Sequence, residues 1–95
     1  MRIRWLTRGL QSLRAAHRYM ALDSVQAAER ATQRIETAVE RLADFPLSGR
    51  AGSVAGTREV VVTGLPYIIV YRVMDSEVQI LRVYHSSRDV RHVFD

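Results

Sequence analysis

The spacing of apolar residues changes once along this chain, and that change most constrains what the chain can fold into. Between residues 25 and 42, apolar and small side chains recur every three or four positions, which is the spacing of one face of an α-helix. From residue 57 onward, short runs rich in β-branched residues are bounded by turn-forming residues, as in strands. Pro46 lies between the two regions and disfavours a helical conformation at Phe45. The sequence therefore predicts a helical first half and a sheet-forming second half.

One strand and two helices are expected before that proline. The strand spans residues 2–6, Thr7 caps the first helix, and Asp23 or Ser24 caps the second, which ends near Asp44. The apolar stripe of the first helix consists of Leu10, Leu13, Ala16 and Met20. That of the second consists of Val25, Ala28, Thr32, Ile35, Val39 and Leu42.

The second half is expected to contain a loop over residues 46–56, strands over 58–63, 67–74 and 77–85, and a polar tail from residue 86. A two-residue turn between the last two strands fixes the residues that face each other. The expected pairs are Met74 with Glu77, Arg72 with Gln79, Val70 with Leu81, and Ile68 with Val83.

These elements predict one domain over residues 1–95 with an α+β fold in the order β-α-α-β-β-β. A small, mostly antiparallel sheet carries the N-terminal helical hairpin on one of its faces. The face that includes Tyr67, Ile69, Tyr71 and Ile80 is apolar, but so is much of the other face. Either the middle strand is buried at the centre of the sheet, or the tail or a partner chain covers the second face.

Composition narrows the classes of function. All fourteen basic residues are arginine, the net charge is +4, and there is no cysteine. Disulfides and thiolate metal sites are thereby excluded, and the three histidines lack the spacing of a metal site, so neither a metal nor another cofactor is expected. The positive charge favours a polyanion or an acidic protein as partner. No membrane span or signal peptide is apparent, which predicts a cytoplasmic protein.

Four segments, in this order, resemble the RelE/ParE family of type II toxin–antitoxin toxins. They are FPLSGR at 45–50, GTREVVV at 56–62, PYIIVYRV at 66–73 and ILRVYHSSRD at 80–89. The resemblance extends over nearly the whole chain. It implies a toxin that an antitoxin neutralises, and two mechanisms occur in the family: RelE-like members cleave mRNA on the ribosome, and ParE-like members inhibit DNA gyrase.

The RelE-like alternative requires a base, an acid and a cation to stabilise the phosphorane. RelE-like ribonucleases have an arginine where this chain has Ile68, and they use lysines, of which this chain has none. A metal-independent endoribonuclease would have to rely on Arg58, Glu59, His85 and Arg88.

The ParE-like branch matches more of the sequence, in its Gly56–Glu59 segment, its Pro66-Tyr67 pair and its His85-x-x-Arg88-Asp89 ending. Ser86 and Val90 depart from that branch, which more often has glycine and an aromatic residue at these positions. A ParE-like toxin is a non-catalytic gyrase inhibitor. The resemblance then implies a target-binding surface formed by Arg50, Arg58, Arg82, His85 and Arg88.

The expected partner is a ParD-like antitoxin whose acidic, amphipathic C-terminal segment lies in a groove between the helical hairpin and the sheet. Operator DNA would be bound only through that antitoxin. A third alternative is a detoxified module that acts only in an autorepressor complex. The residues expected to bind the antitoxin are Leu13, Tyr19, Met20, Ile35, Val39 and Tyr71.

Overall fold

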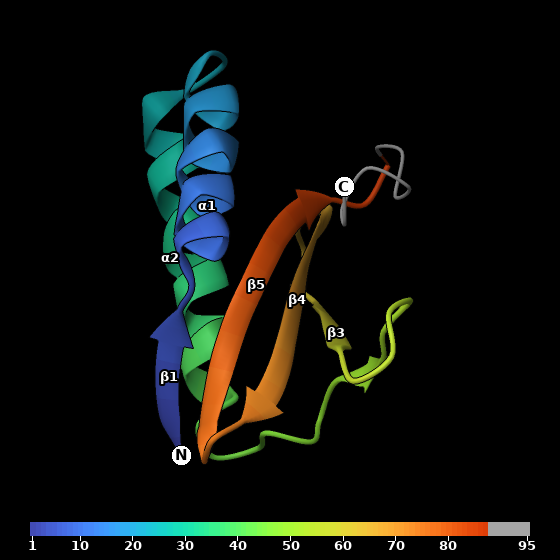
Figure 1. The fold of residues 1–95 in the computed structure, drawn as a ribbon. Helices are drawn as coiled ribbons and strands as arrows, with labels where there is room; N and C mark the ends of the chain where they lie inside the picture. The colour runs from blue at the N-terminus through green and yellow to red at the C-terminus, as the bar shows by residue number, and fades with distance from the viewer. Residues whose placement is uncertain (88–95) are drawn as a thin grey trace.

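A computed structural model describes residues 1–87, in which two helices pack on one face of a five-stranded sheet (Figure 1). The α+β class and the N-terminal helical hairpin are as predicted. The elements are β1 (Arg2–Trp5), α1 (Thr7–Ala21), α2 (Val25–Arg41), β2 (Arg50–Ala51), β3 (Arg58–Val61), β4 (Tyr67–Met74) and β5 (Glu77–His85).

The strands lie in the order β1-β5-β4-β3-β2. β1 pairs in parallel with β5, whereas all other neighbouring strands are antiparallel. The bounds of β4 and β5 are those predicted. β2 lies inside the region predicted as a loop, so the element order is β-α-α-β-β-β-β.

The helices begin and end close to the expected positions, with one difference at each. The N-cap of α1 is Leu6, without a side-chain hydrogen bond, and Thr7 is already helical. Ser24 caps α2, since its hydroxyl accepts a hydrogen bond from the Ala27 N–H at 3.1 Å. α2 ends at Arg41, followed by a turn, so the helix stops short of Asp44. Among the described residues, no helix is both long and apolar enough to span a membrane.

The predicted apolar stripe of α2 forms most of its buried face. Ala28, Ile35, Val39 and Leu42 are buried, but Val25 is 58% exposed and Ala31 is buried in addition. The core joins both helices to the sheet face nearest them. Its members are Leu13, Ala16, Ile35, Val39, Leu42, Val62, Tyr67, Ile69, Tyr71, Val78, Ile80 and Val83.

β4 is buried on both faces over Tyr67–Tyr71, which confirms the interpretation of this segment as a central strand. A bulge in β5 alters its pairing with β4. Tyr71 pairs with Ile80, but Val70 pairs with Arg82, so Leu81 is left without a counterpart. The predicted pairs Val70–Leu81 and Ile68–Val83 are therefore wrong, while the two pairs nearest the turn are right.

The bulge also changes which side chains face the helices. Beyond it, Val83 enters the core and Tyr84, which pairs with Ile68, lies on the opposite face of the sheet. Strict alternation predicts the reverse for these two residues. One inserted residue is enough to exchange the faces, because side chains alternate with a period of two.

α1 approaches β5 very closely at this bulge. The Val83 N–H donates to the Ser12 hydroxyl at 2.8 Å, and this hydroxyl donates to the Gly9 carbonyl at 2.8 Å. Gly9 is buried, and a Cβ atom added to it would collide with the Ile80 carbonyl oxygen. The close approach therefore requires glycine inside a helix.

Replacing Gly9 by alanine is expected to destabilise the fold by about 1–3 kcal/mol, the usual cost of overpacking. The direction of the stability change tests the contact, since a glycine-to-alanine substitution in an unhindered helix interior stabilises the protein by up to about 1 kcal/mol. Urea unfolding measures the difference, with the exposed Gln11→Ala on the same helix as a control that should remain close to wild type. A Gly9→Ala protein as stable as wild type would show that α1 does not contact β5 in this way.

Candidate functional site

The segment after α2 is fixed by a buried tyrosine. Tyr71 is fully buried, and its hydroxyl donates to the Pro46 carbonyl at 2.8 Å and accepts from the Gly49 N–H at 2.9 Å. A Cβ atom on Gly49 would lie 2.6 Å from that hydroxyl, so the contact needs glycine. The Arg58 guanidinium adds bonds to the carbonyls of Leu47, at 3.2 Å, and Gly49, at 2.9 Å.

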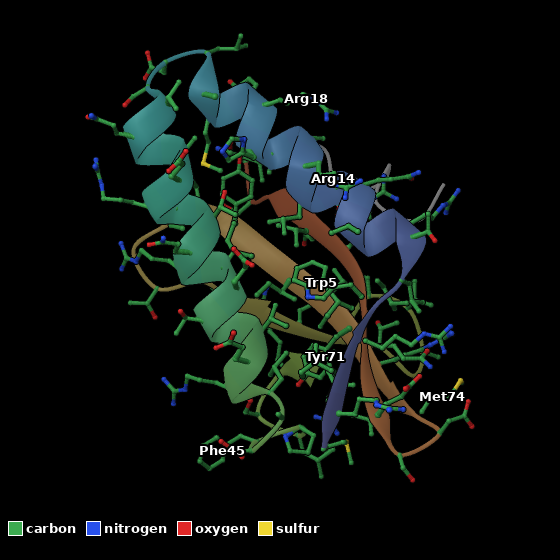
Figure 2. The ribbon with its side chains drawn as sticks, turned by 90° about the vertical axis from the view of Figure 1, so that its left-hand side faces the viewer. Trp5, Arg14, Arg18, Phe45, Tyr71 and Met74 are labelled. Atoms are coloured by element: carbon green, nitrogen blue, oxygen red, sulfur yellow. The ribbon has the colours of Figure 1, made fainter. Side chains whose placement is uncertain are left out.

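This anchored backbone carries two large apolar side chains on the surface. Phe45 is 59% exposed and Leu47 is 65% exposed. Figure 2 shows Phe45 beyond the end of α2, with Tyr71 inside the molecule. Because the backbone that carries these side chains is ordered before binding, less entropy is lost when a partner arrives, which favours their use as interaction hot spots.

Phe45 also lines a groove between α2 and β3, referred to below as the α2–β3 groove. Two adjoining hollows of about 530 and 470 Å³ form it, and they share Ala38, Arg41 and Thr63. Its walls combine apolar side chains with several arginines. The lining residues are Arg30, Gln33, Arg34, Thr37, Ala38, Arg41, Leu42, Phe45, Ser48, Arg50, Glu59, Val60, Val61, Val62 and Thr63.

The outer edge of β3 forms part of this groove. Within residues 1–87, β2 pairs only with the first two residues of β3. The Val62 N–H bonds to the Tyr67 carbonyl in the direction of β4, so by alternation the backbone groups of Val61 point to the outer edge. At Thr63 the edge carbonyl accepts a 2.8 Å bond from the Arg34 guanidinium. The groove therefore offers a short stretch of strand edge at Val61.

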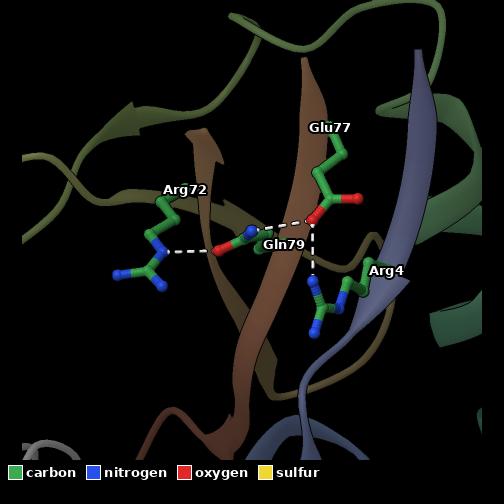
Figure 3. A network of polar contacts seen from close by, with 4 residues as sticks. All are labelled: Arg4, Arg72, Glu77 and Gln79. Atoms are coloured by element: carbon green, nitrogen blue, oxygen red, sulfur yellow. Dashed lines mark hydrogen bonds and ion pairs between the residues drawn. The ribbon is translucent and has the colours of Figure 1, made fainter. Parts of the chain in front are cut away.

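The sheet face away from the helices, referred to below as the far face, carries a polar network (Figure 3). Arg4 bonds to the Glu77 carboxylate at 3.2 Å, and the Gln79 amide donates to the same oxygen at 2.8 Å. The other end of that amide accepts from Arg72 Nε at 2.7 Å. Glu77 and Gln79 are 8% and 4% exposed, so two buried polar groups connect two arginines.

The electrostatics of this face follow from these contacts. The hydrogen bond from Gln79, followed by the bond and charge of Arg4, lowers the pKa of Glu77 below its usual value despite partial burial. The carboxylate is therefore ionised at neutral pH. A second pair joins Arg50 to the buried Glu59 at 3.4 Å. Burial, and then the Glu59 charge, raise the pKa of the Tyr84 hydroxyl.

Comparison with known families identifies the chain. The family described as the ParE toxin of the type II toxin–antitoxin system parDE matches residues 3–90. This chain belongs to the ParE toxin family. It is a toxin of a type II toxin–antitoxin system, in agreement with the resemblance found in the sequence.

Individual relatives agree with this assignment. The toxin is 46% identical over 87 residues to the Y4kP protein of Sinorhizobium fredii, covering 92% of this chain and 90% of that protein. It is 40% identical over 84 residues to Toxin RelE2 of Caulobacter vibrioides, covering 88% and 93%. Among solved structures, it resembles a chain of the chromosomal ParDE system from P. aeruginosa, with a TM-score of 0.79 and 28% identity, covering 90% and 95%.

The three residues proposed for RNA cleavage that the structure describes do not form one cluster. Arg58 pairs with Tyr71 and His85 with Tyr67, so they lie four residues apart along β4, or about 13 Å. Glu59 follows Arg58 directly and lies on the far face, paired with Arg50. Arg88, the fourth candidate, lies outside the described residues.

Of the residues expected to bind the target, the four that the structure describes do not form one surface. Arg50, exposed at β2, and Arg82, beside the bulge, lie on the far face. Arg58 holds the Leu47 and Gly49 carbonyls, as described above. The His85 ring packs edge-on against Tyr67, with ring centres 5.2 Å apart, and its Nδ1 lies 2.7 Å from the Ser87 hydroxyl.

Four of the residues expected to bind the antitoxin are not on the surface. Leu13, Ile35, Val39 and Tyr71 are at most 8% exposed, since all four belong to the core. The apolar periodicity from which these residues were predicted indicates the face that packs in the core, and not a face that is available to a partner. Tyr19 is 54% exposed near the tip of the helical hairpin, where it and Met20 line a separate hollow, and for these two residues antitoxin binding stays a prediction.

Sequence reasoning missed the two polar arrangements that organise the surfaces. The link between Arg4 and Glu77 depends on the parallel pairing of β1 with β5, which local patterns do not reveal. The pairing of Arg72 with Gln79 was predicted, and a polar pair on an otherwise apolar hairpin was the sequence signal that could have indicated the network.

Among residues 1–87, no group of three or more His, Asp or Glu side chains is placed to hold a metal ion.

Replacing Tyr71 by phenylalanine is expected to cost about 1–3 kcal/mol of stability, because the buried Gly49 N–H loses its partner. Chemical denaturation measures the loss. The control is Tyr84→Phe, whose hydroxyl makes no hydrogen bond with other described residues and whose removal should change stability by less than about 0.5 kcal/mol. Equal effects of the two substitutions would mean that the Tyr71 hydroxyl does not anchor the loop.

Proposed function

We propose that this toxin acts without catalysis, inhibits DNA gyrase, and is neutralised by a ParD-like antitoxin. The observation that carries the proposal is the match to the ParE family over residues 3–90. The likeness to a chain of a ParDE system supports the same branch.

The geometry supports a binding function more than RNA cleavage. Among residues 1–87 the candidate acid–base and cation groups are separated, and Arg58 is engaged with loop carbonyls. Ile68, at the position where RelE-like ribonucleases have an arginine, is only 7% exposed. The likeness to Toxin RelE2 keeps ribosome-dependent cleavage as the alternative to be tested. A detoxified module in an autorepressor complex is the remaining alternative.

A supercoiling assay with purified gyrase tests the proposal. The chain should inhibit supercoiling in proportion to its concentration, and the double variant Arg50→Ala/Arg82→Ala should inhibit at least about tenfold less, a loss of about 1.4 kcal/mol of binding. Arg14→Ala/Arg18→Ala, on the outer side of α1 (Figure 2), is the control with the same change of charge. Unchanged supercoiling at a large excess of wild-type chain would contradict the gyrase proposal.

Toeprinting of translating ribosomes, with Arg58→Ala and His85→Ala as controls, then decides between ribosome-dependent cleavage and a detoxified module.

The α2–β3 groove is the proposed site for the antitoxin segment. Its apolar floor and its arginines complement an acidic, amphipathic segment, because charge speeds association and apolar anchors provide affinity. The outward-pointing groups of Val61 allow a short strand to add to β3. Phe45, held in position at one end of the groove, is the proposed anchor.

Substitutions in the groove test this assignment. Phe45→Ala and Arg41→Glu should each weaken binding of the antitoxin's C-terminal segment by at least about tenfold, or about 1.4 kcal/mol. Arg18→Glu, on the outer side of α1, should change it much less. Calorimetric titration gives the affinities, and co-expression with the antitoxin should increase the amount of soluble toxin. Equal weakening by Arg18→Glu and Arg41→Glu would place the segment elsewhere.

A further inference from the structure

The far face holds most of the excess positive charge of the chain. Cross-strand pairing places five arginines on it, against the two carboxylates of Glu59 and Glu77. That excess of three compares with a net charge of +4 for the whole sequence. The arginines come from four different strands; they are Arg2, Arg4, Arg50, Arg72 and Arg82.

Two of these arginines stand in one row across the sheet. Arg4 of β1 and Arg72 of β4 are both paired with Gln79 of β5, so one strand separates them and their Cα atoms lie about 10 Å apart. Gln79 and Glu77, both nearly buried, hold the two guanidinium groups on either side of β5 (Figure 3). Burying an amide and a carboxylate is costly unless they are bonded, and here their bonds fix the orientation of two cations.

Both guanidinium groups retain donors. Arg72 uses only its Nε in the network, and Figure 3 draws no contact from either of its η nitrogens. Arg4 uses one η nitrogen, and its side chain is 62% exposed. Within the described residues, no further hydrogen bond engages these nitrogens. A guanidinium with a free edge forks onto phosphate oxygens.

We propose that the far face binds the phosphodiester backbone of a nucleic acid, with Arg4 and Arg72 each contacting a phosphate and with Glu77 and Gln79 as positioning residues. Cations spread over four strands cannot all reach one small anion, but they can follow a polymer of regularly repeated charge. Tyr84, half-buried on the same face two residues beyond Arg82 along β5, provides an aromatic ring for a base to stack on. An acidic protein segment instead requires apolar anchors, which are found in the adjoining α2–β3 groove, where Arg50 and Glu59 belong to both surfaces.

Fluorescence anisotropy with a labelled twelve-nucleotide single-stranded DNA tests the proposal on the full chain. Arg4→Ala/Arg72→Ala should weaken binding at least tenfold. It should also reduce the salt dependence, the slope of log affinity against log salt concentration, by about 1.4, since each phosphate neutralised on a single strand contributes about 0.7. The control Arg14→Ala/Arg18→Ala removes the same charge from the outer side of α1 and should change the affinity less than about twofold.

Loss of binding in the double variant could also result from unfolding, so its fold is measured as well. If circular dichroism shows that Arg4→Ala/Arg72→Ala is unfolded, Arg4→Lys/Arg72→Lys replaces it. This variant should keep the salt dependence while losing affinity, because lysine cannot fork onto a phosphate. Equal weakening by the α1 control, absence of binding by wild type, or stronger displacement of the DNA by polyglutamate than by unlabelled DNA of equal charge would each overturn the proposal. This inference does not rest on the gyrase proposal, because binding to DNA is measured without gyrase.

Discussion

The single residue inserted into β5 at Leu81 determines much of this structure. It brings Val83 to the helices and Tyr84 to the far face, and it leaves the Val83 N–H to be satisfied by Ser12 of α1. The helix can come close enough for that bond only because Gly9 has no side chain where it meets Ile80. The bulge therefore sets both the packing of the helical hairpin and the composition of the surface behind it.

Sequence patterns predicted the parts of the fold that depend on neighbours along the chain. The bounds of β4 and β5 were found because a tight turn separates two β-rich runs, and Asp75 and Ser76 indeed have positive φ angles of 55° and 59°. The bulge was missed because nothing at Leu81 distinguishes it from an ordinary strand residue. β2 was missed because two residues are too few to show a pattern, and its pairing with β3 depends on the anchored loop before it.

The candidate site was predicted less well, for a related reason. Sequence patterns identify apolar faces but do not tell a face that packs internally from one that meets a partner, so Ile35 and Val39 were assigned to the wrong role. Arginines raise a similar difficulty. Arg58 and Arg72 look alike in sequence, yet Arg58 donates to carbonyl groups of the loop, while Arg72 uses only its Nε and keeps its η nitrogens outside the network. Only tertiary contacts separate a structural cation from one available for recognition.

The hydrogen bond from the Arg34 guanidinium to the Thr63 carbonyl affects how readily the chain can aggregate. An open strand edge is a template on which identical chains can pair, leading to aggregation. Here β2 pairs with one end of that edge and the Arg34 guanidinium bonds to the carbonyl at the other, so the described part of β3 leaves the backbone of Val61 for an added strand. A segment that binds there must gain most of its affinity from side chains, and so short an edge disfavours the pairing of β3 with a second copy of the chain.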